Sequence, residues 1–216
     1  MGKDVVSPAA HTAFKTPAEL LDFVVRLREM SGGKPIGFKL CVGRRDEFLG
    51  ICKAMLKSRV TPDFITVDGG EGGTGAAPTE MTNSVGTPLR DALIFVNQAL
   101  IGIGLRDQVR RMASGKVFTA FHMLRVMTLG ADTIISARGM MMALGCIQSR
   151  SCNTNHCPTG IATTEKSRSD GLDVTDKGVR VANFHKATVK NLVELIAATV
   201  PVEWRDDWLA AGAARW

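Results

Sequence analysis

DFITVDGGEGGTGAAP, residues 63–78, joins a short apolar run to a glycine-rich loop. The run from Asp63 to Asp68 is typical of a buried parallel strand. The loop that follows would lie at the carboxyl end of that strand, where barrel and open-sheet enzymes carry their active sites. Its glycines allow a close approach of the backbone to a ligand, although the spacing matches neither a Walker loop nor a dinucleotide fingerprint. A flexible structural loop is the alternative.

Strand and helix patterns alternate on both sides of this stretch. Strands are expected at residues 35–42, 63–68, 109–113 and 132–137, and helices at about 17–30, 45–57, 87–100, 119–129 and 179–199. This alternation indicates an α/β fold with parallel strands. Four strand–helix units are half of those in a (β/α)₈ barrel, so the pattern leaves open a small open sheet or half a barrel.

Composition narrows the function classes. The 216 residues carry a formal net charge of +6, but the basic residues are scattered and aromatic residues make up only 6%, which argues against nucleic-acid binding. We expect neither a membrane span nor a signal peptide, and therefore a cytoplasmic protein. Five cysteines, an odd number, suit thiols or metal ligands in a reducing compartment better than disulfides.

Three of these cysteines form the motif Cys146-x5-Cys152-x4-Cys157, with Pro158 directly after it. Thiolates are soft ligands for iron–sulfur clusters, zinc or copper. Zinc would need a fourth ligand such as His156, which is awkwardly placed next to Cys157. The motif therefore favours a cluster with three cysteine ligands, and a chance grouping of thiols is the alternative. The other two cysteines, Cys41 and Cys52, are expected in the core.

Polar and basic residues follow the predicted strands. Ser114-Gly115-Lys116 and Ser136-Ala137-Arg138-Gly139 come after the last two strands, where barrels often bind phosphate. Lys39 lies inside an apolar strand, where it needs a partner or a ligand unless it reaches solvent at the edge of the sheet. Arg44, just beyond that strand, is a candidate for binding an acid substrate, or simply a surface arginine.

With these features in order, the chain resembles the FMN-binding synthase domain of glutamate synthases. The segments that carry the resemblance are SPAAHTAFKTPAELL (7–21), GGKPIGFKL (32–40), ITVDGGEGGTGAAP (65–78), ASGK (113–116), SARGMMMALGCIQSRSCNTNHCPTGIAT (136–163) and RVANFHKATV (180–189). They cover nearly the whole chain, to about residue 200.

The resemblance implies a (β/α)₈ barrel that holds FMN at the carboxyl ends of its strands, and a [3Fe-4S] cluster that passes electrons to the flavin. Ammonia released from glutamine by a separate module would condense with 2-oxoglutarate, and the reduced flavin would then give L-glutamate. The enzyme would be an oxidoreductase acting on CH-NH2 donors.

The resemblance also assigns residues. Lys39 is implied as catalytic and flavin-contacting, and Arg44 is our candidate for the substrate. The implied cofactor-binding residues are Gly69, Gly70, Gly72, Gly73, Ser114, Gly115, Lys116, Ala137, Arg138 and Gly139, and the implied cluster ligands are Cys146, Cys152 and Cys157.

The family's domain is longer than this chain. We expect residues 1–200 to be its C-terminal half, about strands five to eight, with the cluster loop at 146–158 and a tail at 201–216. An N-terminal half or a second copy would complete the barrel, and a separate protein or subunit would supply electrons. Two other interpretations stay open: a non-catalytic iron–sulfur fragment or assembly module without flavin activity, and a related flavin-barrel oxidoreductase with another acceptor.

Overall fold

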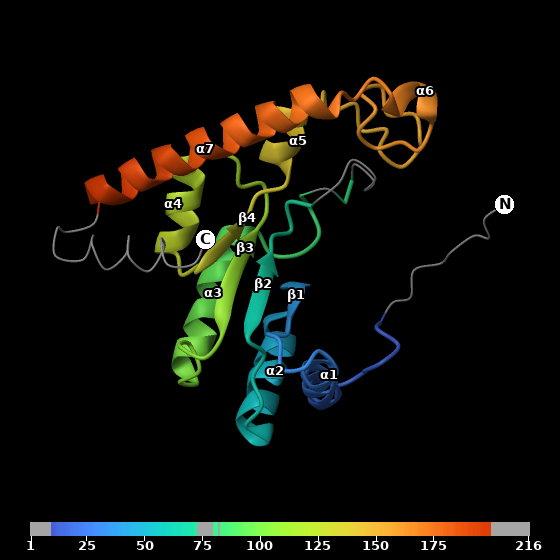
Figure 1. The fold of residues 1–216 in the computed structure, drawn as a ribbon. Helices are drawn as coiled ribbons and strands as arrows, with labels where there is room; N and C mark the ends of the chain where they lie inside the picture. Colours follow the sequence, from blue (N-terminus) through green and yellow to red (C-terminus); the bar gives the residue numbers. More distant parts are fainter. Residues whose placement is uncertain (1–9, 73–79, 82, 200–216) are drawn as a thin grey trace.

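Four parallel strands form one sheet in the computed structural model, which describes residues 10–72, 80, 81 and 83–199 (Figure 1). The strands are β1 (Gly37–Cys41), β2 (Phe64–Asp68), β3 (Arg110–Ser114) and β4 (Thr133–Ile135). They lie in the order β1-β2-β3-β4, so each strand pairs with its neighbour in the sequence. This order suits a fragment of a (β/α) barrel, because doubly wound sheets reverse their strand order. The predicted α/β class with a parallel sheet is confirmed.

Helices connect the strands and extend beyond them. They are α1 (Pro17–Met30), α2 (Arg45–Ser58), α3 (Leu89–Gly102), α4 (Ala120–Thr128), α5 (Arg138–Leu144), α6 (Lys166–Ser169) and α7 (Val174–Thr199). Thr16 begins α1 with a capping box, since its hydroxyl accepts from the Glu19 amide while the Glu19 carboxylate accepts from the Thr16 amide.

The main differences from the sequence-based expectation lie in the C-terminal part of the chain. The last helix begins at Val174 rather than 179, because the Asp173 carboxylate accepts from the Thr175 amide at 2.9 Å and caps it there. The fourth strand is shorter than predicted, and the helices α5 and α6 were not expected. Since α5 begins at Arg138, the second predicted phosphate segment runs into a helix.

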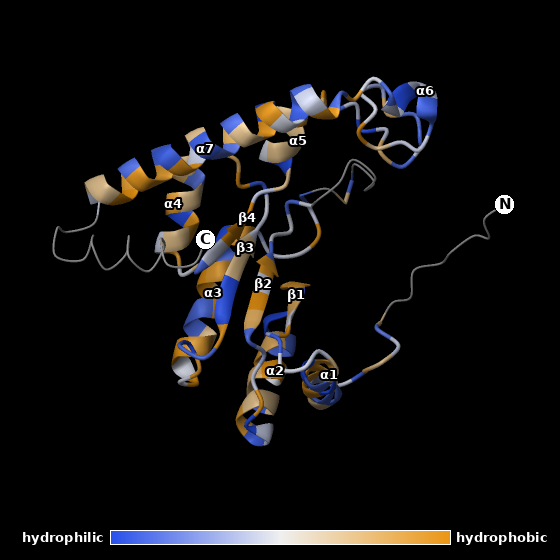
Figure 2. Cartoon of the chain, viewed as in Figure 1, coloured by the Kyte–Doolittle hydropathy of each residue, from blue (hydrophilic) through white to orange (hydrophobic). Residues whose placement is uncertain are grey.

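One face of the sheet packs against helices and forms the core. Ile65, Val67 and Ala113 are fully buried there, against α3 side chains such as Leu93 and Val96. Side chains alternate between faces along a strand, so the intervening residues lie on the opposite face. Most of β2 is hydrophobic in colour in Figure 2, whereas α6 is hydrophilic.

The opposite face is much more open. Lys39 exposes 56% of its side chain, and Ile135 on the edge strand β4 is 38% exposed. Cys41 shares this face and is exposed, so its predicted place in the core is wrong, whereas Cys52 in α2 is buried as expected. The error follows from the alternation along β1, in which Phe38 and Leu40 are the residues that pack against the core.

Helix α7 lies across α4 and α5 (Figure 1). Thr188 and Ile196 are its buried residues. Within the described residues, no helix combines the length and the apolar character needed to cross a membrane.

A buried ion pair holds the amino end of the sheet together. Arg111 is fully buried in β3, and its Nη2 lies 2.6 Å from the Asp132 carboxylate, which also accepts from the Arg111 amide at 2.8 Å. The guanidinium donates to the carbonyls of Gly130, Arg106 and Val109 as well. Nη2 is buried and makes no hydrogen bond of its own among the described residues, so the adjacent Asp132 charge is what compensates its burial.

Candidate functional site

The loops after β2, β3 and β4 meet at the carboxyl end of the sheet. The Gly69 amide donates to the Ser114 carbonyl at 2.8 Å, which ties the glycine loop to the end of β3. The Ser136 hydroxyl donates to the Val117 carbonyl at 2.8 Å, which joins the loop after β3 to the segment after β4. The structure therefore brings the glycine loop and both predicted phosphate segments together at the carboxyl end of the sheet.

Lys39 finds its partner in the neighbouring strand. Its Nζ lies 2.8 Å from Oδ2 of Asp68, with the two side chains 56% and 32% exposed. Lys39 pairs with Thr66 in the register, and Asp68 stands two residues further along β2, on the same face of the sheet. The pair is an accessible ammonium held beside a carboxylate on the open face.

Cys41 ends β1 close to this pair. Partial burial and the negative charges of Asp68 and Glu71 together raise the pKa of its thiol. A raised pKa keeps the thiol protonated near neutral pH, so Cys41 is a poor nucleophile there.

Glu71, which the sequence analysis did not single out, organises the glycine loop. Both of its carboxylate oxygens accept from the Leu89 amide, at 3.0 and 3.1 Å. Leu89 is the first residue of α3, and Pro88 before it offers no side-chain cap. A proline at the N-cap position is the sequence signal that the cap must come from elsewhere.

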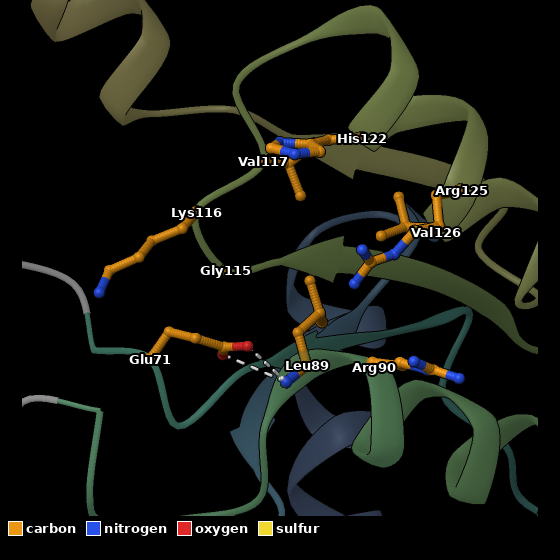
Figure 3. A pocket seen from close by; sticks show the side chains of 9 residues that line it. All are labelled: Glu71, Leu89, Arg90, Gly115, Lys116, Val117, His122, Arg125 and Val126. Atoms are coloured by element: carbon orange, nitrogen blue, oxygen red, sulfur yellow. Dashed lines mark hydrogen bonds between the residues drawn. The ribbon is translucent and has the colours of Figure 1, made fainter.

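A cavity of about 160 Å³ opens beside this contact (Figure 3). Its lining residues come from the glycine loop, the start of α3, the turn after β3 and α4: Glu71, Leu89, Arg90, Gly115, Lys116, Val117, His122, Arg125 and Val126. Three cationic side chains, those of Arg90, Lys116 and Arg125, therefore line the cavity together with the Glu71 carboxylate. Figure 3 shows Lys116 extending away from Arg125 and His122.

The predicted phosphate residues divide between a turn and a helix. Lys116 adopts a left-handed backbone with φ of 49°, and its ammonium donates to the Asn83 side-chain oxygen. Ala137 precedes α5, whereas Arg138 and Gly139 form its first turn. Of these predicted residues, only Gly115 and Lys116 line the cavity. Four others lie outside its lining: Ser114, Ala137, Arg138 and Gly139.

Of the remaining predicted residues, Arg44 has a local role, and some others lie outside the described residues. Arg44 pairs with Asp46 at 2.6 Å at the start of α2, with both side chains largely exposed. Gly72 is described, with φ of 73°, whereas Gly73 lies outside the described residues. The predicted tail at 201–216 also lies outside them.

The cysteine segment follows α5. Among its three thiols, that of Cys157 has a clearly shifted pKa. Hydrogen bonding with the Thr159 hydroxyl, at 3.4 Å, and with the Ala162 amide lowers the pKa of Cys157 to about 7. Cys146 and Cys152 are both half-buried. A thiol that ionises near neutral pH suits a soft metal, because the thiolate is the metal ligand.

The three cysteine side chains are not close enough together to form a metal site. Among residues 10–72, 80, 81 and 83–199, no three Cys, His, Asp or Glu side chains lie together so that they could hold a metal ion. Nδ1 of His156 lies 2.8 Å from Glu165, a contact that leaves Nε2 of the same ring able to bind a metal, so the zinc alternative stays open. The donor set thus fits iron–sulfur chemistry by type, and its ligation of a cluster stays a prediction.

Side chains beside the motif brace its last turn. The Asn155 side chain accepts from the Thr164 amide at 2.7 Å, and Glu165 contacts both His156 and Arg168. Hydrogen bonds with Arg168, and to a lesser extent the His156 contact, lower the pKa of Glu165 below its usual value. The chain around Cys157 is therefore anchored on its C-terminal side.

Comparison with known proteins places this arrangement in a family. Residues 1–200 match the family model described as "Conserved region in glutamate synthase". The chain is 43% identical over 197 residues to the glutamate synthase large subunit-like protein YerD of Bacillus subtilis, covering 91% of this chain and 37% of that protein. It is 32% identical over 198 residues to the archaeal glutamate synthase [NADPH] of Methanocaldococcus jannaschii, covering 91% and 38%.

Among solved structures, the nitroalkane oxidase of Streptomyces ansochromogenes is similar at 18% identity, with a TM-score of 0.37 over 53% of this chain and 29% of that one. This likeness is too distant to carry an argument. The chain spans under two-fifths of the length of the two glutamate synthase relatives, at 37% and 38%. The match over residues 1–200 shows that this chain belongs to the glutamate synthase family.

Proposed function

We propose that this chain is a flavin-binding module of a glutamate synthase-type oxidoreductase, and that it provides the C-terminal half of the barrel. The observation that carries the proposal is the meeting of three successive strand-end loops at the carboxyl end of the sheet. The hydrogen bonds from Gly69 to Ser114 and from Ser136 to Val117 fix it. Phosphate and flavin sites of barrels are built from such loops.

FMN would be held mainly by backbone groups. The turn Ser114-Gly115-Lys116 would present amides to the phosphate, with the Lys116 ammonium as a counter-charge. Ala137, Arg138 and Gly139 would complete the site from the next strand. The glycines at 69, 70, 72 and 73 would let the loop lie close to the flavin ring.

Lys39 and Arg44 would bind and orient the acid substrate. Lys39, held by Asp68 at 2.8 Å on the open face, would contact the flavin and orient the acid substrate. Arg44 would bind a carboxylate of 2-oxoglutarate after leaving Asp46, an exchange that costs little because both side chains are exposed. When bound, FMN supplies the two-electron reduction that converts the imine of ammonia and 2-oxoglutarate to L-glutamate.

Cys146, Cys152 and Cys157 would hold a [3Fe-4S] cluster, which supplies one-electron transfer when bound. Binding has to bring these thiols together, because they are not gathered among the described residues. The lowered pKa of Cys157 supports its role as a ligand. A reducing compartment such as the cytoplasm would keep all three as thiols.

The open face of the sheet implies a partner. An N-terminal half-barrel, or a second copy of this chain, would cover Lys39 and pair with the edge strands β1 and β4. The longer relatives support the first of these, since the match covers under two-fifths of each, at 37% and 38%. An electron-donating protein or subunit would reduce the cluster.

A ligand comparison tests the phosphate site. FMN and riboflavin differ only in the phosphate, so we would titrate both into wild type, K116A and the control K186A, and follow the quenching of flavin fluorescence. We expect K116A to weaken FMN about tenfold, the loss of one charge-assisted hydrogen bond, while riboflavin binding stays unchanged. Lys186 is an exposed lysine on α7, and its loss should change neither.

Two results would contradict the proposal. Equal affinity of wild type for FMN and riboflavin would mean that the loops hold no phosphate. Iron in the purified chain with no affinity for either flavin would favour the non-catalytic iron–sulfur module instead.

A further inference from the structure

Glu71 lies at the carboxyl end of the sheet, between the glycine loop, the turn after β3 and the start of α3. Its carboxylate accepts from the Leu89 amide, at 3.0 and 3.1 Å, from a position 18 residues earlier in the chain. The first amides of a helix have no acceptor within the helix, and a negative charge there is favoured by the helix dipole. Glu71 therefore fastens the glycine loop to the start of α3.

Two glycines leave the space that this carboxylate occupies. A Cβ at Gly69 would overlap the Glu71 carboxylate and lie 2.7 Å from Cβ of Leu89. A Cβ at Gly115 would lie 3.3 Å from Oε2 of Glu71 and 3.2 Å from Cβ of Leu89. The glycine loop and the phosphate turn thus close on the same side chain, which is half-buried between them.

Backbone hydrogen bonds extend this junction to β1. The Gly70 amide donates to the Thr87 carbonyl, and the Thr87 amide donates to the Val42 carbonyl, both at 2.8 Å. A displacement of Glu71 would therefore shift the backbone at the carboxyl ends of β1, β2 and β3. These are the ends that carry Cys41, Asp68 and Ser114 in one row of the register.

We propose that Glu71 is a positioning residue for flavin binding: its carboxylate fixes the glycine loop against the Ser114–Lys116 turn and the start of α3. The part that concerns flavin rests on the proposed function, whereas the positioning itself does not. Glu71 is not proposed to touch the flavin or the substrate.

Two substitutions separate the position of this side chain from its charge. E71A removes the acceptor of the Leu89 amide, whereas E71Q keeps an oxygen that can accept but removes the charge. E47Q is the matched control, since it removes an exposed carboxylate in the first turn of α2, at the same end of the sheet.

Hydrogen exchange at the Leu89 amide measures whether the side chain at position 71 still accepts its hydrogen bond. In the full-length chain we expect exchange to be at least about tenfold faster in E71A, since the amide loses its acceptor, but to stay within about threefold of wild type in E71Q and E47Q. The conservative variant therefore rescues the contact. Unchanged exchange in E71A would overturn the positioning.

The alkylation rate of Cys41 measures the effect of the Glu71 charge on the pKa of that thiol. Trypsin releases Cys41 in residues 40–44 and Cys52 in residues 46–53, so mass spectrometry follows the two thiols separately. Removing the Glu71 charge lowers the pKa of Cys41, and we expect alkylation about threefold faster at mildly alkaline pH in both E71Q and E71A. E47Q should leave Cys41 unchanged. No change in either Glu71 variant would place the carboxylate elsewhere and overturn the proposal.

FMN titration then tests the link to flavin. We expect E71A to bind FMN about tenfold more weakly and E71Q within about threefold of wild type. If wild type binds FMN and E71A binds it equally well despite faster Leu89 exchange, the link to flavin is wrong and the proposed function stands. If wild type binds no FMN, the proposed function and its link to Glu71 fail together, while the exchange and alkylation results still decide the positioning.

Discussion

Replacing Asp132 with asparagine should strip the buried Arg111 of its counter-charge. The guanidinium is fully buried, and Oδ2 of Asp132 lies 2.6 Å from its Nη2. Asp132 also pairs with Arg106 at 3.3 Å and lies 4.0 Å from Arg110. Asparagine is nearly isosteric, so D132N changes the charge without opening a cavity.

The expected loss is about 3 kcal/mol of unfolding free energy. Breaking a buried pair by removing one partner costs roughly 3–5 kcal/mol. The lower end applies because Arg111 keeps its hydrogen bonds to the carbonyls of Gly130, Arg106 and Val109. D170N is the control: the pair of Lys166 and Asp170 is 86% and 59% exposed, so its loss should cost at most about 0.5 kcal/mol.

Urea unfolding followed by far-ultraviolet circular dichroism measures both variants. A D132N variant that is no less stable than D170N would refute the account of the buried pair.

Three further predictions concern ionisable side chains. Burial alone would raise the pKa of Asp63, but the Ile36 amide and the Arg28 guanidinium outweigh it and hold that pKa below its usual value. A lowered pKa in the folded state stabilises above the unfolded pKa of about 4, and this stabilisation is lost as the pH falls through the folded pKa. Thermal unfolding should therefore show D63N less stable than wild type at neutral pH, with the difference shrinking below about pH 4; a constant difference would argue against the ion pair. Separately, the thiolate ultraviolet absorbance of the metal-free chain should show one thiol ionising near pH 7, owing to hydrogen bonds to Cys157, and this step should be absent in C157S. Cys52, whose pKa burial raises to about 11, should resist alkylation throughout, and rapid modification of Cys52 would contradict its burial.

The sequence predicts the sheet well because its signals are local. Apolar runs next to turn residues place all four strands, and Thr16 with Pro17 places the start of α1. The last helix is misjudged because its first turn, beginning at Val174, is exposed and lacks an apolar stripe. Its cap, Asp173, is a signal that could have been used.

The sequence predicts which loops lie at the same end of the sheet, but not the contacts between their side chains. Strand-end loops in a parallel sheet must share one edge, so the meeting of Gly69 with Ser114 follows from topology. The pair of Lys39 and Asp68 depends on the register of two strands, which the sequence does not specify. The contact of Glu71 with Leu89 spans 18 residues and rests on tertiary packing. Cys41 was misplaced because an apolar run does not say which face of its strand is covered.

The central claim is that this chain itself carries the flavin loops and the cluster cysteines. The most direct test is the visible absorption spectrum of the full-length chain, purified without oxygen and supplied with FMN and iron, with bound flavin and iron assayed on the same sample. We predict flavin bands together with a broad iron–sulfur absorbance that is lost in the C157S variant. A colourless chain that retains neither flavin nor iron would contradict the claim.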